Sequence, residues 1–99
     1  MLQINKTVAN GKAVFALEGR LDTVTAPEME SAMQEVLPEL TSLTLDFAGL
    51  EYISSAGLRV LLAAQKAMNV KGEMRVKNVS KAIMEIFEIT GFSDVLTIE

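Results

Sequence analysis

The sequence predicts an α/β domain with a mixed β-sheet of four to five strands and three to four α-helices packed mainly on one face. Strand-like and helix-like hydrophobic patterns alternate in the order β-β-α-β-α-β-α, which is typical of a mainly parallel or mixed sheet. Right-handed crossovers then place the helices on a sheet face. No linker, repeat or low-complexity segment interrupts the 99 residues. Residues 1–99 are therefore expected to form a single domain.

The chain opens with a predicted β-hairpin. Leu2, Ile4 and Val8 alternate with polar neighbours, which indicates a strand with one buried face. Asn10-Gly11 follows, and this dipeptide is typical of a type I′ turn because both central positions need positive φ. The segment Val14–Glu18 then returns as a second, more continuously apolar strand.

A first helix is predicted after the hairpin. Thr25 and Glu28 match the T-x-x-E capping box, and Pro27 falls in the first turn, where a missing N–H does no harm. Pro38 ends the segment. The apolar residues at helical spacing are Met29, Met33, Val36 and Leu37.

The centre of the chain predicts a third strand, a loop and a second helix. Leu43–Phe47 alternates as a half-buried strand, and a helical pattern runs from about Leu58 to Met68, with Gln65 on its apolar face. The segment Asp46–Gly57, which runs from the end of this strand to the start of the helix, is expected to contain the loop after the strand's carboxyl end. Open α/β sheets bind ligands and partners at such places.

The last third predicts a short strand, a helix and a terminal strand. Lys71-Gly72 ends the second helix, and Met74 and Val76 indicate the fourth strand. Ser80 is the expected N-cap of the next helix, and Gly91 is its expected left-handed C′ residue. Its apolar face comprises Ile83, Ile86 and Phe87, and Val95–Ile98 is expected to add a strand.

The composition argues against catalysis. The chain has no histidine and no cysteine, so its serines lack the usual base, and Lys66 lies about three turns from them on the polar side of the helix. No phosphate-cradling glycine motif is present. A carboxylate-only site from Asp22, Asp46 and Glu51 is the alternative, but scattered acids are usually surface groups. We predict no enzyme, no catalytic residue, no metal and no cofactor.

Charge and hydropathy limit the partners. The net charge of −4 does not favour DNA or an anionic membrane. No segment approaches the ~20 apolar residues that span a bilayer, and the N-terminus lacks the apolar core of a signal peptide. We therefore expect a cytoplasmic protein that binds neither nucleic acid nor membrane.

The segment Ser54-Ser55-Ala56-Gly57 lies at the predicted N-terminus of the second helix. Unpaired N–H groups and the positive end of the helix dipole favour an anion there, and the small side chains leave room for a partner. These serines have no route to being nucleophiles, which indicates a hydroxyl that another protein modifies. The alternative is that either serine is simply an N-cap.

Three blocks of sequence together resemble one family. They are Glu18–Asp22 with Thr25–Pro27, then Leu45–Phe47 with Tyr52–Leu62, and finally Asn78–Ser80 with Phe87–Phe92. In this order, over essentially the whole chain, they resemble STAS domains, specifically bacterial anti-sigma factor antagonists. The resemblance implies the STAS fold.

The resemblance also implies a phosphorylation switch. In such proteins a hydroxyl residue at the start of the second helix is phosphorylated by an anti-sigma factor that is a GHKL-type serine kinase, and a PP2C-type phosphatase removes the phosphate. The unphosphorylated antagonist binds the kinase and releases its target. The family pattern D-S-[ST]-G places Ser54 at the aspartate position and favours Ser55 as the phosphoacceptor, with Ser54 second.

The resemblance and the helical pattern together predict a partner-binding surface on a monomer. Its expected residues are Asp22, Asp46, Ser54, Ala56, Gly57, Arg59, Ala63 and Lys66. Asp22 and Asp46 have a second interpretation as residues that only hydrogen-bond their own turns or loops. Two other classes stay open: a STAS interaction subunit of a lipid- or membrane-transport assembly without phosphoswitching, and a small-molecule or nucleotide-binding module.

Overall fold

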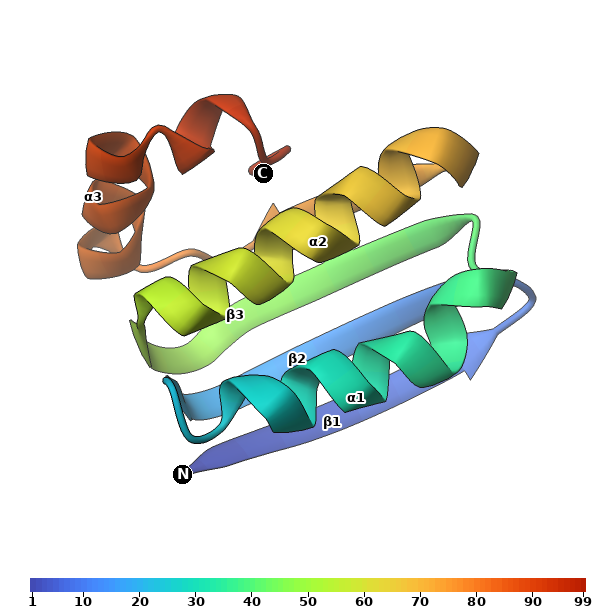
Figure 1. Cartoon of the computed structure of the whole chain (residues 1–99), viewed down its shortest axis with the longest axis horizontal. Helices are drawn as coiled ribbons and strands as arrows, with labels where there is room; N and C mark the ends of the chain where they lie inside the picture. Colours follow the sequence, from blue (N-terminus) through green and yellow to red (C-terminus); the bar gives the residue numbers. More distant parts are fainter.

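A mixed sheet with strand order β1-β2-β3-β4 forms one layer of the computed structural model, which describes residues 1–99 (Figure 1). β1 (Leu2–Ala9) pairs antiparallel with β2 (Lys12–Leu21), while β3 (Ser42–Ile53) lies parallel to both β2 and β4 (Glu73–Lys77). The predicted mixed sheet is confirmed, with four strands.

Three helices form the second layer. Figure 1 shows α1 (Ala26–Val36) and α2 (Ser55–Lys71) side by side over one face of the sheet, with α3 (Lys81–Thr90) near the end where α2 begins. Short 3₁₀ turns follow α1 at Leu37–Glu39 and α3 at Phe92–Asp94. The helices leave the opposite face of the sheet uncovered.

Alternation along the strands builds the core. Phe15 and Leu17 of β2, Leu45 and Phe47 of β3, and Val76 of β4 are all buried on the helix-covered face. Intervening residues, such as Thr44 and Arg75, face the other side, as the two-residue period of a strand requires. The ring centroids of Phe47 and Phe87 lie 6.4 Å apart, and this contact packs α3 against the sheet.

Local signals set the ends of several elements as predicted. Asn10 and Gly11 have φ angles of 54° and 77°, as a type I′ turn requires. The Ser80 hydroxyl accepts a hydrogen bond from Ile83 N at 3.2 Å, and Gly91 ends α3 with φ of 82°. Gln65 is buried on the inner side of α2.

The predicted capping box at Thr25 is wrong. The backbone of Thr25 is already helical, with φ of −91° and ψ of −18°, and its side chain makes no capping hydrogen bond. Its hydroxyl donates instead to the carbonyl oxygen of Arg20 at 2.8 Å. The carboxylate of Asp22 accepts from Thr25 N in its place. Pro27 does lie in the first turn of α1.

The predicted loop from Asp46 to Gly57 is also wrong. β3 continues to Ile53, because Leu50 pairs with Gly19 and Ile53 with Leu21 along β2, and both side chains enter the core. α2 then begins at Ser55, three residues earlier than the apolar pattern suggests.

The predicted terminal strand at Val95–Ile98 reduces to a single bridge between Val76 and Ile98. Amides of Val95 and Leu96 donate to the carbonyl oxygen of Phe92, so the 3₁₀ turn occupies the start of this segment. Only Thr97 and Glu99 reach the backbone of Val76.

Candidate functional site at the start of helix α2

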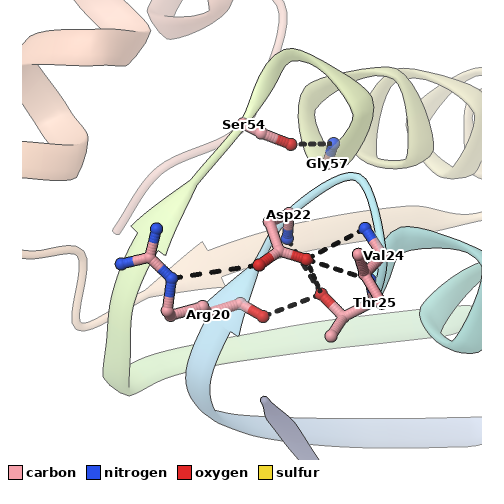
Figure 2. A network of polar contacts seen from close by, with 6 residues as sticks. All are labelled: Arg20, Asp22, Val24, Thr25, Ser54 and Gly57. Carbon is pink, nitrogen blue, oxygen red and sulfur yellow. Dashed lines mark hydrogen bonds and ion pairs between the residues drawn. The ribbon is translucent and has the colours of Figure 1, made fainter.

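Two adjacent serines have different positions at the start of α2. Ser54 is the N-cap, with an extended backbone (φ −98°, ψ 175°), and its hydroxyl accepts from Gly57 N at 3.3 Å (Figure 2). Ser55 is the first helical residue; it is exposed, and its hydroxyl makes no hydrogen bond. The capping interpretation therefore holds for Ser54 and is wrong for Ser55.

The sheet determines where α2 begins. Ser54 N donates to the carbonyl oxygen of Leu21 at 2.9 Å, so the chain leaves β3 while still bonded to the end of β2. Gly57 packs into the same corner, because a Cβ there would lie 2.8 Å from Leu21 Cγ and 2.9 Å from Ile53 Cγ1. This buried glycine lets the first turn of α2 rest directly on the sheet and presents Ser55 outward.

Asp22 holds the neighbouring turn between β2 and α1 (Figure 2). Its Oδ1 accepts from Val24 N and Thr25 N, both at 3.0 Å. The hydrogen bond from the Thr25 backbone is the main reason that the pKa of the Asp22 carboxyl lies below its ordinary value. The interpretation of Asp22 as a turn residue is confirmed; its contact with a partner stays a prediction.

Tertiary contacts add residues that the sequence pattern did not reveal. Val24 is 81% exposed at the tip of the turn that Asp22 holds, and Tyr52 is 38% exposed at the end of β3. The guanidinium of Arg20 lies 4.2 Å from the centre of the Tyr52 ring. The pairing of Arg20 with Tyr52 depends on a register shift between β2 and β3, so no local signal could have found it.

A shallow groove runs between α1 and α2 beside Ser55. Its first part, about 370 Å³, is lined by Thr23, Ala26, Pro27, Glu30, Ala56, Arg59 and Val60. A second part of about 210 Å³ shares Glu30 and Val60 and adds Met33, Gln34, Leu37, Ala63 and Ala64. We call the two parts the α1–α2 groove. A larger hollow, about 530 Å³ and lined by Met1, Leu2, Gln3, Glu18 and Gly19, contains no predicted site residue.

The structure brings together most, but not all, of the predicted partner-binding residues. Ala56, Arg59 and Ala63 line the α1–α2 groove, and Lys66 is exposed on the same helix. Gly57 is buried against the sheet.

Asp46 lies apart from this group. Its neighbours Leu45 and Phe47 are buried under the helices, so Asp46 points to the uncovered face of the sheet. Its Oδ1 accepts from Asn78 Nδ2 and from Ala48 N, both at 3.0 Å. The Asn78 hydrogen bond is the main cause of a lowered pKa at Asp46. The bond from Ala48 N agrees with the interpretation of Asp46 as a residue that hydrogen-bonds the chain just after it, and the bond from Asn78 adds a contact outside that segment. A contact of Asp46 with a partner stays a prediction.

The structure contains no group of three or more acidic side chains placed to hold a metal ion, so Asp22, Asp46 and Glu51 do not form such a site. None of the helices combines the length and the apolar character needed to cross a membrane.

Comparisons with known proteins identify the family. The STAS domain model matches residues 3–99. The chain is 33% identical over 91 residues to BtrV of Bordetella bronchiseptica, covering 90% of this chain and 78% of BtrV. It is 30% identical over 97 residues to the anti-sigma-B factor antagonist of Staphylococcus aureus, covering 96% of this chain and 90% of that protein.

Solved structures of anti-sigma factor antagonists share the fold. The antagonist from Mycobacterium paratuberculosis superposes with a TM-score of 0.89 at 23% identity, over 99% of this chain and 85% of that one. Unphosphorylated SpoIIAA superposes with a TM-score of 0.77 at 18% identity, over 100% of this chain and 87% of that one. Antagonists of this kind are regulators and not enzymes, in agreement with the prediction from the sequence. The chain belongs to the STAS domain family, and its relatives include anti-sigma factor antagonists.

Proposed function

We propose that the protein is an anti-sigma factor antagonist switched by phosphorylation of Ser55. In its unphosphorylated form it binds a GHKL-type serine-kinase anti-sigma factor and thereby releases the target of that factor, as a monomer in the bacterial cytoplasm. A PP2C-type phosphatase resets the switch. The observation that carries this proposal is the exposed, unbonded hydroxyl of Ser55 at the first residue of α2. Its relatives among anti-sigma factor antagonists support it.

The choice of Ser55 over Ser54 rests on accessibility. The Ser54 hydroxyl accepts from Gly57 N and is only partly exposed, so a kinase would have to open the helix cap to reach it. The Ser55 hydroxyl is exposed and has no bond to lose. In the transfer, Ser55 Oγ bonds to the γ-phosphorus of ATP, the bond from that phosphorus to the β–γ bridging oxygen breaks, a base of the kinase takes the hydroxyl proton, and ADP is released.

The proposed partner surface surrounds Ser55. It comprises the α1–α2 groove with Ala56, Arg59 and Ala63, the neighbouring Lys66, and the turn held by Asp22. We add Val24, because an apolar side chain that is 81% exposed at the tip of this turn is a natural anchor for a partner. Asp46 would join this surface only if the partner also reached the uncovered face of the sheet.

Phosphorylation acts on this interface through charge. A phosphoserine carries about −1.5 to −2 charges at neutral pH. At the start of α2 the positive end of the helix dipole stabilises that charge. In the kinase, the phosphates of the bound nucleotide are negatively charged and would repel a phosphoserine beside them. Unfavourable charge contacts at an interface cost several kcal/mol, so we expect affinity to fall by about a hundredfold or more.

Incubation with the cognate kinase and ATP, followed by mass spectrometry, tests the proposal. We expect one phosphate, on Ser55. Ser55→Ala should still bind the kinase and accept no phosphate. Ser54→Ala is the matched control, because it should lose about 1 kcal/mol of stability with the helix cap and still be phosphorylated.

Phosphate on Ser54 alone would move the switch by one residue. A protein that binds no serine kinase and takes up no phosphate would contradict the proposal and favour the transport-assembly alternative.

A further inference from the structure

Arg59 differs from the other two arginines in the chain. Arg20 Nε lies 3.9 Å from an oxygen of Asp22, and Arg75 pairs with Glu73 at 3.1 Å and with Glu99 at 3.2 Å. Arg59 is exposed and pairs with no carboxylate. Its guanidinium is therefore available to an anion that the unmodified protein does not contain.

Helix geometry places this guanidinium within reach of Ser55. The two residues are four positions apart in α2, and both are exposed. Side chains at this spacing lie on one face with Cβ atoms about 5–6 Å apart. Helical side chains also tilt toward the N-terminus of their helix. The long side chain of Arg59, which lines the α1–α2 groove in the unmodified protein, is therefore within reach of the first turn, where the Ser55 hydroxyl lies.

The acidic side chains near Ser55 and Arg59 leave the Arg59 guanidinium without an ion-pair partner. The first turn of α2 contains no acidic residue. Glu30 of α1 faces Arg59 across the α1–α2 groove but forms no ion pair with it. Asp22, in the turn between β2 and α1, already accepts from two backbone amides. None of these carboxylates competes strongly for Arg59 against a phosphate dianion one turn away.

We propose that phosphorylated Ser55 forms an ion pair with Arg59, which withdraws the guanidinium from the α1–α2 groove. This inference rests on the proposed phosphorylation of Ser55. The planar guanidinium matches two phosphate oxygens, and an acidic residue N-terminal to its basic partner is the favourable orientation for this spacing. The modification then changes the partner surface twice, because it adds negative charge and removes the arginine that lines the groove.

The test uses protein with phosphoserine installed at residue 55 during synthesis, so that no kinase is needed. ³¹P NMR titration gives the second pKa of the phosphate, ordinarily about 6. We expect Arg59→Gln to raise this pKa by at least about 0.3 units, since one pairing cation is lost. Lys66→Gln is the matched control: it removes the same charge from α2 at a residue about 16 Å along the helix from Ser55, and it should leave the phosphate pKa unchanged.

A second readout uses the unmutated chain. The Nε–H resonance of Arg59, assigned with Arg59→Lys, should shift when Ser55 carries phosphate, and the resonances of Arg20 and Arg75 should not. Equal phosphate pKa values in wild type and Arg59→Gln, or an unmoved Arg59 resonance, overturn the ion pair. Because the phosphate is installed chemically, these results do not depend on the kinase. A kinase that ignores Ser55 would overturn the proposed function and leave the ion pair standing.

Discussion

At the scale of single residues, the start of α2 depends on three small residues with different roles. Ser54 caps the helix, Ser55 presents a free hydroxyl, and Gly57 allows the backbone to approach Leu21 and Ile53. A methyl group at residue 57 would meet atoms closer than 3.0 Å, so the first turn of α2 would have to move. The position of the proposed phosphoacceptor therefore depends on a residue that never reaches the surface.

The carboxyl of Asp22 makes the free energy of unfolding depend on pH. Its pKa is lower in the folded chain than the value of about 3.9 expected when unfolded. Between these two values the unfolded state binds more protons, so stability rises with pH. We expect Asp22→Asn to be less stable than wild type at pH 7, with the difference shrinking as pH falls through the lowered pKa.

Urea denaturation at pH 7 and near pH 3 measures this effect. Asp46 also has a lowered pKa but is unchanged in the Asp22→Asn variant, so the comparison isolates Asp22. A stability difference that stays constant between the two pH values would show that the Asp22 hydrogen bonds do not stabilise the ionised form.

At the scale of elements, the turn between β2 and α1 and the first turn of α2 are both held in place by hydrogen bonds at the ends of β2 and β3. Two backbone amides bond to Asp22, and the backbone of Ser54 bonds to Leu21, so both segments are fixed to the ends of neighbouring strands. Val24 and Ser55 consequently project from a rigid frame. Preorganised surfaces of this kind lose little conformational entropy when a partner binds.

Val24→Asp tests whether this turn belongs to the partner surface. A charge placed at a buried contact should weaken binding to the anti-sigma factor at least about tenfold, equivalent to ~1.4 kcal/mol. Val70→Asp is the matched control, because Val70 is 88% exposed near the far end of α2. Calorimetry on both variants gives the comparison. Equal affinities for the two would place the interface elsewhere.

At the scale of the whole molecule, one face of the sheet carries the helices and the hydrophobic core, while the proposed switch lies at one end of that layer (Figure 1). Ser55 is outside the core, whose members include Leu58 and Leu61 of the same helix. A change of charge at Ser55 is therefore expected to alter binding without altering the fold.

Ser55→Asp tests this separation. We expect the melting temperature to stay within a few degrees of wild type, since a negative charge at a helix start gains about 0.3–1 kcal/mol from the dipole. Binding to the kinase should fall strongly. Thermal denaturation and calorimetry on the same sample measure both quantities. A Ser55→Asp protein that unfolds would replace the interface mechanism with a folding mechanism.

Most of the architecture could be predicted from local patterns. The turn at Asn10-Gly11, the cap at Ser80 and the end of α3 at Gly91 were all predicted, because each depends on the φ angles or hydrogen bonds of a few adjacent residues. The same local rules also produced one wrong prediction, at the start of α1. The motif at Thr25 resembles a capping box, but the Thr25 side chain makes no capping hydrogen bond, and the Asp22 carboxylate accepts from Thr25 N.

The sequence by itself determined the order of the elements, the mixed sheet, the family and the placement of two serines at the start of a helix. The tertiary structure decided which serine is free, how far β3 extends, and that a groove opens beside Ser55. The physical reason is the range of the contacts. Leu21 pairs with Ile53 and bonds to Ser54, more than 30 residues along the chain, and only that pairing sets the residue at which α2 begins.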